Sequence, residues 1–214
     1  MRYLIVCGGK IDKEFGLNEI KTDGIDAIIA ADSGMDFLYE NGVTPDIIVG
    51  DFDSATTKAL EYFKRKGQTE IHRLNPIKDD TDTEYAIRLA ISDGARSIVM
   101  LGATGSRIDH VLGNISLLGI GLESGTDISI IDTNNRIRMA DKPVTIEKSA
   151  QYGRFVSLIA VTDDNEVSLR GFKYPVTDYS FDRFTSLGIS NEIIDDHAVM
   201  YTVKTGEKGH YAFF

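Results

Sequence analysis

The chain has 214 residues, enough to bury a substantial core in one large domain or two modest ones. Hydrophobic residues make up 42% and charged residues 26%, a balance typical of a folded protein rather than a disordered one. The formal charge of −10, with no cluster of basic and aromatic residues, argues against nucleic-acid binding. A chain this acidic needs divalent cations or a local basic patch if it is to bind an anionic nucleotide.

The chain also lacks the signals of zinc and membrane proteins. Cys7 is the single cysteine, which excludes an intrachain disulfide and a multi-cysteine zinc site. The four histidines show no HExxH or HxxxH spacing, so we do not expect a zinc enzyme. The apolar run near the N-terminus is too short for a signal peptide, and no stretch approaches the roughly 18 apolar residues of a membrane span. We therefore expect a cytoplasmic protein that has no membrane partner.

The first two-thirds of the chain alternates short β-type runs with helical patterns, which indicates an α/β domain with a mostly parallel sheet. Strands are expected at residues 3–6, 27–31, 47–49, 71–74, 97–101 and 128–131. Between them we expect a helix at 55–66 capped by Ser54, a helix from a capping box at Thr81 and Glu84 to about residue 93, and a helix at 107–123 that stops at Gly125.

Beyond about Asn134 the sequence shows strand patterns alone, which predict a small β-sandwich. We place the boundary after residue 134, which gives an α/β domain at 1–134 and a β domain at 135–214, although no Pro/Gly-rich linker marks it. The expected strands of the second domain are 144–146, 155–161, 166–169, 198–203 and 210–213.

Glycine and aspartate recur directly after the predicted strands of the first domain. Ligands of open α/β sheets bind beyond the carboxyl ends of the strands, so we expect these loops to converge at one functional edge. The segments concerned are GGK at 8–10, DSG at 32–34, GDFDS at 50–54, KDDTD at 78–82 and GATGSRIDH at 102–110.

Asp51 and Asp53 are two residues apart, so in an extended segment their carboxylates point the same way while Phe52 points back to the core. Such a pair suits Mg²⁺, which prefers hard oxygen ligands and completes its shell with water and phosphate oxygens. An alternative interpretation is that Asp53 and Ser54 only cap the following helix.

The next two loops are open to two interpretations as well. Acidic residues at 79–82 complement a helix dipole, whereas Lys78 beside them could contact a phosphate as a point charge. The glycine-bearing loop at 102–110 leads into a helix, where backbone N–H groups and Arg107 could hold phosphate oxygens. Nothing in the spacing of His110 requires catalysis, so an ordinary core or surface histidine fits it too.

Familiar nucleotide motifs are missing, since the chain has no GxxxxGK[ST] and no complete GxGxxG. Its loop motifs instead resemble, in order and spacing, those of the thiamine pyrophosphokinase family along nearly the whole chain. Ser33 stands where that family often has a second glycine, a minor departure that keeps a small residue. The segments that carry the resemblance are ADSG at 31–34, PD at 45–46 leading to GDFDS at 50–54, KD at 78–79 with TD at 81–82, GATGSRIDH at 102–110 followed by Asn114, GFKYP at 171–175 and GISN at 188–191.

The resemblance implies an α/β nucleotide-binding domain followed by a thiamine-binding β-sandwich, assembled as a homodimer. The implied reaction transfers the pyrophosphoryl group of ATP to thiamine and gives thiamine diphosphate and AMP. By position, the resemblance implies that Asp51, Asp53 and Asp82 bind Mg²⁺ and act in catalysis with Arg107. Ser190 and Asn191 are the implied thiamine contacts. The implied ATP-binding positions are Asp32, Lys78, Thr81, Gly102, Thr104, Gly105, Asp109 and His110.

This chemistry agrees with the composition, because transfer of a phosphoryl-type group needs positioning and charge neutralisation more than covalent catalysis. An aspartate of the cluster is the expected acceptor of the hydroxyl proton. Two other classes stay open, namely a Mg²⁺-dependent nucleotide hydrolase and a non-catalytic nucleotide-sensing module. Neither of these classes requires the second β domain.

Overall fold

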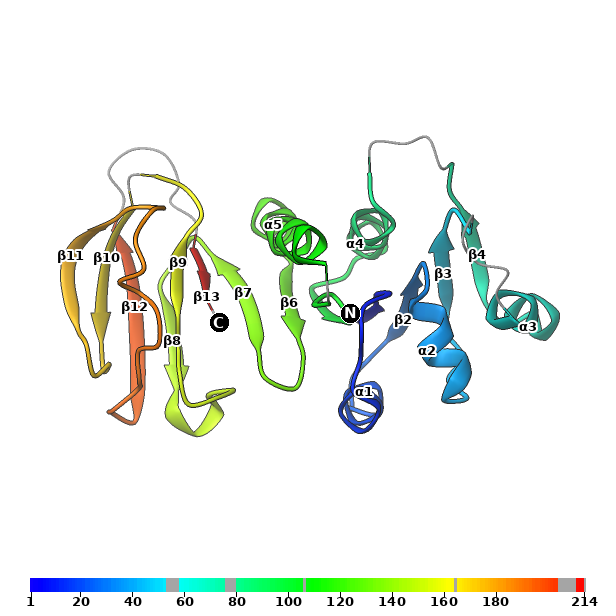
Figure 1. The fold of residues 1–214 in the computed structure, drawn as a ribbon, viewed down its shortest axis with the longest axis horizontal. Helices are drawn as coiled ribbons and strands as arrows, with labels where there is room; N and C mark the ends of the chain where they lie inside the picture. Colours follow the sequence, from blue (N-terminus) through cyan, green and yellow to red (C-terminus); the bar gives the residue numbers. More distant parts are fainter. Residues whose placement is uncertain (53–57, 76–79, 106, 164, 204–210, 214) are drawn as a thin grey trace. The chain divides into compact units, whose positions relative to one another are not determined.

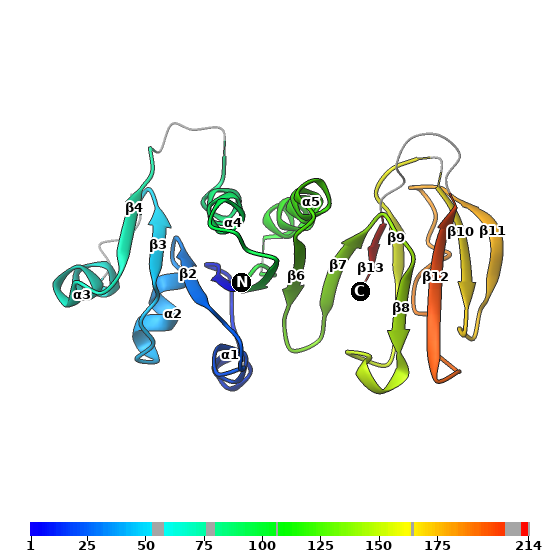
Figure 2. The same cartoon turned by 180° about the vertical axis from the view of Figure 1, so that it is seen from behind.

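A computed structural model describes residues 1–52, 58–75, 80–105, 107–163, 165–203 and 211–213 of the chain. The chain divides into two compact units, Met1–Thr133 and Asn134–Phe214. Figures 1 and 2 show helices and strands in the first unit and mainly strands in the second. Among the described residues, no helix is both long and apolar enough to cross a membrane.

Parallel strands build the sheet of the first unit. They are β1 (Arg2–Val6), β2 (Ala27–Ala31), β3 (Ile47–Gly50), β4 (Glu70–Arg73), β5 (Ser97–Leu101) and β6 (Asp127–Ile131). Their order across the sheet is β4-β3-β2-β1-β5-β6, and neighbouring strands pair in parallel. The strand order reverses between β1 and β5, which makes this position the switch point where open α/β sheets bind ligands. The parallel sheet predicted from the sequence is confirmed.

The helices of this unit are α1 (Lys13–Ile20), α2 (Gly34–Glu40), α3 (Lys58–Lys66), α4 (Asp82–Ser92) and α5 (Ile108–Ser124). The last three confirm predicted helices, although Ser54, the predicted cap of α3, lies outside the described residues. Thr81 caps α4, where its hydroxyl accepts a hydrogen bond from the backbone N–H of Glu84 at 3.1 Å. Gly125 ends α5 in the left-handed conformation, as expected.

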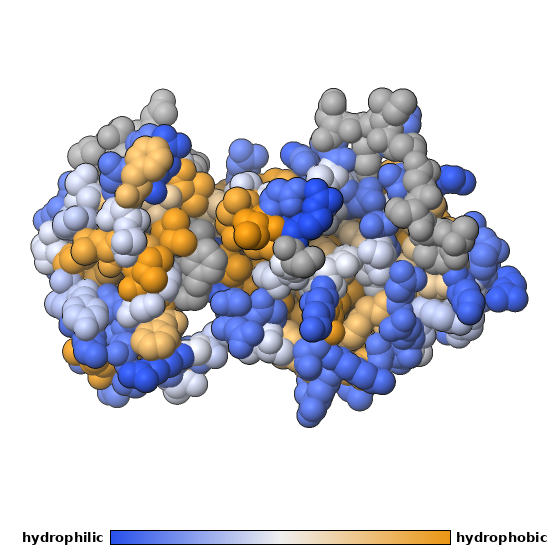
Figure 3. Space-filling model, in the orientation of Figure 1, coloured by the Kyte–Doolittle hydropathy of each residue, from blue (hydrophilic) through white to orange (hydrophobic). Residues whose placement is uncertain are grey.

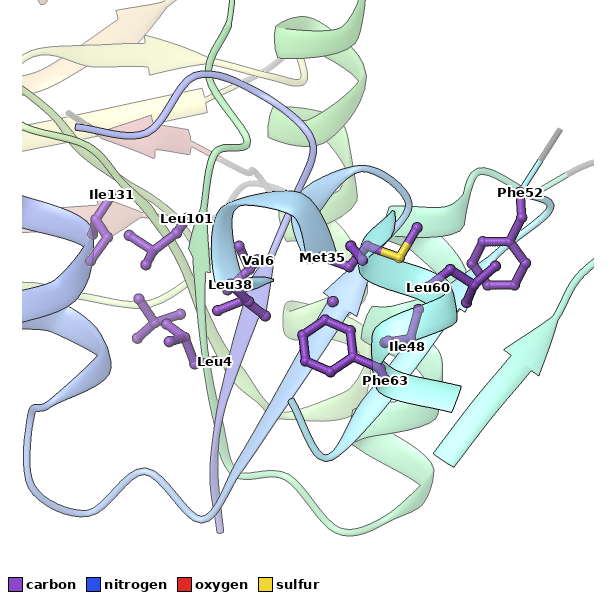
Figure 4. Close-up of a cluster of buried hydrophobic side chains, with 13 residues drawn as sticks. Leu4, Val6, Met35, Leu38, Ile48, Phe52, Leu60, Phe63, Leu101 and Ile131 are labelled. Carbon is purple, nitrogen blue, oxygen red and sulfur yellow. The ribbon is translucent and has the colours of Figure 1, made fainter. Parts of the chain in front are cut away.

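Alternating side chains give the sheet two apolar faces. Figure 1 shows α4 and α5 on one side of the sheet and α1 and α2 on the other. The cluster drawn in Figure 4 joins strand residues to α2 and α3, and it includes Leu4, Val6, Ile48, Met35, Leu38, Leu60 and Phe63. On the opposite face, α4 contacts β1, β2 and β3. Residues there that are fully buried include Ile5, Ile29, Ala86, Ile87 and Ala90.

Two antiparallel groups of strands make up the second unit. One has the order β11-β10-β12-β8 and the other has β13 between β7 and β9. Buried side chains from both groups form one core, which confirms the predicted sandwich. Two of these strands, β7 and β11, were not predicted. The bounds are β7 (Arg136–Ala140), β8 (Val144–Glu147), β9 (Leu158–Ala160), β10 (Asn165–Arg170), β11 (Val176–Phe181), β12 (His197–Val203) and β13 (Tyr211–Phe213), with a short 3-10 helix at Lys148–Ala150.

The start of α2 lies against the end of β1, and this packing depends on a glycine. A Cβ on Gly34 would overlap the carbonyl oxygen of Val6. Gly34→Ala should therefore lower the free energy of unfolding by about 1–3 kcal/mol, the usual cost of overpacking a close contact. Urea unfolding of the purified variant measures this change.

Gly113→Ala is the matched control, because Gly113 is also helical but has no heavy atom within 4 Å of the added Cβ. Alanine is the better helix former, so this variant should be more stable than the parent by roughly 0.5–1 kcal/mol. Equal stability of the two variants would mean that α2 does not pack so closely against β1.

Candidate active site

The loops after β1 and β5 touch at the switch point. The backbone N–H of Gly9 donates to the carbonyl oxygen of Gly102 at 2.9 Å. A Cβ on Gly9 would overlap that oxygen and lie 2.7 Å from the carbonyl oxygen of Thr104, while one on Gly105 would lie 3.7 Å from the Cα atom of Gly9. A side chain at position 9 would force the two loops apart, so glycine here is a condition for their contact.

Three aspartates meet at the same edge of the sheet. Asp32 follows β2, Asp51 follows β3, and Asp82 is the first residue of α4. Each offers a carboxylate oxygen, and these oxygens all lie within 4.8 Å of one another. The structure thus brings together two predicted metal ligands, Asp51 and Asp82, with the predicted nucleotide-binding residue Asp32. Asp53 and Lys78 lie outside the described residues.

The electrostatics of this cluster favour a bound cation. Partial burial raises the pKa of Asp32 above its ordinary value, and the charges of Asp82 and Asp51 raise it further. Hydrogen bonds from the backbone N–H and the hydroxyl of Ser33 oppose this rise in pKa. Three close carboxylates repel one another, and a hard divalent cation relieves that repulsion with the oxygen ligands it prefers. The donor set therefore fits Mg²⁺.

The backbone is strained at Asp32 and at Phe52, the residue that follows Asp51. Asp32 has a φ of 50° and Phe52 a φ of 59°, values that are uncommon for residues other than glycine. The expectation that Asp51 and Asp53 flank an extended residue is therefore wrong, because a left-handed residue between them breaks the strand alternation. The second half of that expectation is confirmed, since Phe52 is buried in the core beside Gly50.

The predicted phosphate loop at 102–105 is held by two side chains from outside it. Asn114 of α5 donates from Nδ2 to the carbonyl oxygen of Ala103 at 2.7 Å. The hydroxyl of Thr104 donates to Oδ2 of Asp132 at 2.8 Å. Asp132 follows β6 directly and was not among the predicted site residues. Its place after a strand is the signal that could have identified it.

Arg107 and Asp109 pair with each other at the start of α5. Nη2 of Arg107 lies 2.6 Å from Oδ2 of Asp109, and these side chains are 69% and 64% exposed. The hydrogen bonds from Arg107 lower the pKa of Asp109. An exposed ion pair contributes only about 0–1 kcal/mol, so the guanidinium can exchange this partner for a phosphate at little cost. His110 follows in the first turn and is exposed.

In the second unit, Asn191 joins the two predicted thiamine motifs at 171–175 and 188–191. Its Oδ1 accepts from the backbone N–H groups of Tyr174 and Glu192 at 3.1 and 2.9 Å. Its Nδ2 donates to the carbonyl oxygen of Tyr174 at 2.9 Å, and the residue is only 7% exposed. These contacts give Asn191 a structural task within the unit, and its contact with thiamine stays a prediction.

Ser190 differs from its neighbour in being exposed. Its backbone has a φ of 61°, and its N–H donates to Oγ of Ser157 at 3.0 Å. A non-glycine residue held in a left-handed conformation is a feature that clusters at ligand sites. The position is consistent with the predicted thiamine contact.

Fold and site define a two-part protein in which three aspartates meet at the carboxyl edge of a parallel α/β sheet, and an antiparallel β unit follows. Residues 21–130 match the family model described as the catalytic domain of thiamin pyrophosphokinase. Residues 143–207 match the one described as its vitamin B1 binding domain. The chain belongs to the thiamine pyrophosphokinase family, and the resemblance drawn from the sequence is confirmed.

Individual relatives agree with this assignment. A thiamine pyrophosphokinase of Bacillus subtilis is 36% identical over 168 residues, which cover 78% of each chain. A solved structure of thiamine pyrophosphokinase from Bacillus subtilis matches with a TM-score of 0.87 at 30% identity, covering 100% of this chain and 97% of that one. A solved structure of thiamin pyrophosphokinase from Candida albicans shares the fold with a TM-score of 0.80 at 19% identity. The match covers 99% of this chain and 87% of that one.

The raised pKa of Asp32 predicts a pH-dependent cost to stability. In the metal-free protein at neutral pH, the charged Asp32 carboxylate is destabilising, because the folded state binds its proton more readily than the unfolded state does. Asp32→Asn removes that charge, so the variant should have the higher thermal midpoint in a chelator. The difference should shrink as the pH falls through the raised folded-state pKa toward the ordinary value of 3.8.

Excess Mg²⁺ should reverse this order at neutral pH, because a cation that binds only the folded state raises the midpoint of the parent protein more than that of the variant. Scanning calorimetry in chelator and in Mg²⁺ measures both effects. Identical midpoints for parent and variant at every pH would show that Asp32 carries no electrostatic strain.

Proposed function

We propose that this protein transfers the pyrophosphoryl group of ATP to the hydroxyethyl oxygen of thiamine, giving thiamine diphosphate and AMP. Membership of the family across both units supports this reaction. The observation that carries the proposal is the group formed by Asp32, Asp51 and Asp82 at the carboxyl edge of the sheet. Its place is where open α/β sheets bind nucleotides.

We assign Mg²⁺ to this group of aspartates. Asp51 and Asp82 would hold the ion together with Asp53 of the same motif, and Asp32 would complete the acidic surroundings. When bound, Mg²⁺ would neutralise negative charge on the triphosphate during the transfer. This assignment answers the difficulty that a chain with a net charge of −10 has in binding ATP.

The loop at 102–105 and the start of α5 would hold the triphosphate. Asn114 and Asp132 fix the loop, so its backbone N–H groups, including those of Gly102 and Gly105, are held in place for phosphate oxygens. Arg107 would exchange Asp109 for a phosphate oxygen, as a bidentate donor. The other proposed ATP-binding positions are Lys78, Thr81, Thr104 and His110.

An aspartate of the cluster would accept the hydroxyl proton of thiamine. Asp32 is the member whose pKa is raised by partial burial in the metal-free protein. In the second unit, the exposed Ser190 would contact thiamine, while Asn191 would shape the loop that presents it. The acidic character of the chain also favours the cationic thiazolium ring. We also propose that the enzyme acts in the cytoplasm.

We also propose a homodimer. Large apolar side chains reach the surface of the second unit, as Figure 3 shows, and Phe184, Leu187 and Ile189 are 90%, 55% and 47% exposed. This segment runs beside β9, since the backbone N–H of Leu158 donates to the carbonyl oxygen of Gly188 at 2.8 Å. Large exposed apolar side chains are common at interfaces, and a second copy of the chain is the proposed partner. Sedimentation equilibrium gives the mass directly.

The products distinguish this reaction from its alternatives. With ATP, Mg²⁺ and thiamine, we expect thiamine diphosphate and AMP in equal amounts, and a chelator should abolish both. Chromatography of the nucleotides and of thiamine diphosphate measures them. AMP and pyrophosphate formed without thiamine would indicate a nucleotide hydrolase, binding without any product would indicate a sensing module, and ADP would contradict pyrophosphoryl transfer.

Loss of one cluster carboxylate should remove turnover without unfolding the protein. Asp51→Asn should lower kcat by about 10²–10³-fold, because charge stabilisation at the transition state is lost. Asp93→Asn, at the exposed C-cap of α4, is the matched control and should keep normal turnover. Turnover and thermal midpoint are measured on the same samples. Near-normal turnover of Asp51→Asn with a lowered midpoint would assign this aspartate a structural role.

A further inference from the structure

A chain of hydrogen bonds joins β4 to α4, the helix that begins with Asp82. Nε2 of His72 lies 2.6 Å from Oε1 of Glu70, and Nδ1 of His72 lies 3.2 Å from the hydroxyl oxygen of Tyr85. The two rings also contact each other, with centroids 6.0 Å apart. The His72 side chain is 22% exposed, so it is largely withdrawn from water, whereas Glu70 is 68% exposed.

The carboxylate of Glu70 determines the direction of these bonds in the neutral imidazole. An ionised carboxylate only accepts, so Nε2 of His72 must carry the proton and donate to Glu70. Nδ1 is then an acceptor, and the hydroxyl of Tyr85 donates to it. His72 therefore requires an O–H donor from α4, which phenylalanine at position 85 could not supply.

The place of this link in the fold connects it to the cluster. Tyr85 lies three residues after Asp82 in α4, so the two side chains project from the same side of the helix. His72 of β4 pairs in register with Val49 of β3, and Val49 lies two residues before Asp51 in the chain. The link therefore joins α4, which carries Asp82, to β4. Strand β4 pairs with β3, the strand that Asp51 follows.

The link also closes a long connection. His72 and Tyr85 are 13 residues apart in the chain, and the segment between them leads from the end of β4 into the first turn of α4. Asp82 stands in that turn, where a small rotation of the helix would move its carboxylate away from those of Asp32 and Asp51. Their mutual repulsion favours such a movement unless other contacts resist it.

We propose that Tyr85 and His72 are positioning residues for Asp82: their hydrogen bond fixes the first turn of α4 on β4 and so holds the Asp82 carboxylate in the cluster for the metal ion. The proposal rests on the metal role proposed for the cluster. Neither residue needs to touch the ion or the substrate, because both act through the orientation of the helix.

Mn²⁺ binding in the absence of substrates tests this role without reference to turnover. Free Mn²⁺ is measured by electron paramagnetic resonance in titrations of the whole protein. Tyr85→Phe keeps the ring and removes only the hydroxyl, and it should weaken Mn²⁺ binding by about fivefold, the effect of one net hydrogen bond. His72→Leu should weaken binding to the same extent, and the double variant no further, because either change breaks the same link.

His72→Gln should restore binding close to the parent value, since its amide oxygen can accept from Tyr85. Tyr62→Phe, which removes a hydroxyl from α3, is the matched control and should bind Mn²⁺ as the parent does. Thermal midpoints are recorded for every variant in chelator. If Tyr85→Phe and His72→Leu lower the midpoint but bind Mn²⁺ like the parent, the link is only structural and the proposal is overturned.

The same titration separates this proposal from the proposed function. A parent protein that binds no Mn²⁺ would overturn both the metal assignment and the positioning role. A parent that binds Mn²⁺ and forms AMP, with unchanged binding by Tyr85→Phe, would overturn the positioning role alone. If His72→Gln weakens binding as much as Tyr85→Phe does, an acceptor at position 72 is not sufficient, and the hydrogen-bond basis of the proposal is overturned. Weaker binding in a protein that forms no AMP would support the positioning role and contradict only the proposed reaction.

Discussion

Three carboxylates at the carboxyl edge of the sheet lie closer together than their charges favour. Partial burial raises the pKa of Asp32, and the neighbouring charges of Asp82 and Asp51 raise it further. The groups stay together because each is attached to a different rigid element, namely β2, β3 and α4. The arrangement therefore lowers the stability of the fold at neutral pH, and a bound cation relieves this cost. Local strain of this sort is the usual accompaniment of a preorganised site.

The surrounding structure explains how that arrangement is maintained. Phe52 is held in a left-handed conformation by its ring, which is buried in the same cluster as Leu60 and Phe63 (Figure 4). The switch point brings the loops after β1 and β5 into contact, and glycine at position 9 permits that contact. Core packing and site geometry are thus parts of one structure, because the buried ring lies next to Asp51 in the chain.

Much of this architecture could be predicted from the sequence, because parallel strands are buried on both faces and form apolar runs such as 97–101. Strand β11 escaped prediction because most of its side chains are exposed, and β7 because few of its side chains are buried. The convergence of Asp51 and Asp82 was predicted because both lie in segments that follow predicted strands. The conformation of Phe52 was not, since a positive φ at a non-glycine residue is imposed by tertiary packing and leaves no local signal.

The hydrogen bonds of the Asn191 amide limit how loops can be exchanged between members of the family. It satisfies both the N–H and the carbonyl group of Tyr174, so the loops at 171–175 and 188–191 share one set of hydrogen bonds although 17 residues separate the two partners. A loop taken from another member of the family would bring only half of that set. Changes of substrate preference in this unit are therefore more accessible to evolution, and to engineering, when both loops are inherited together.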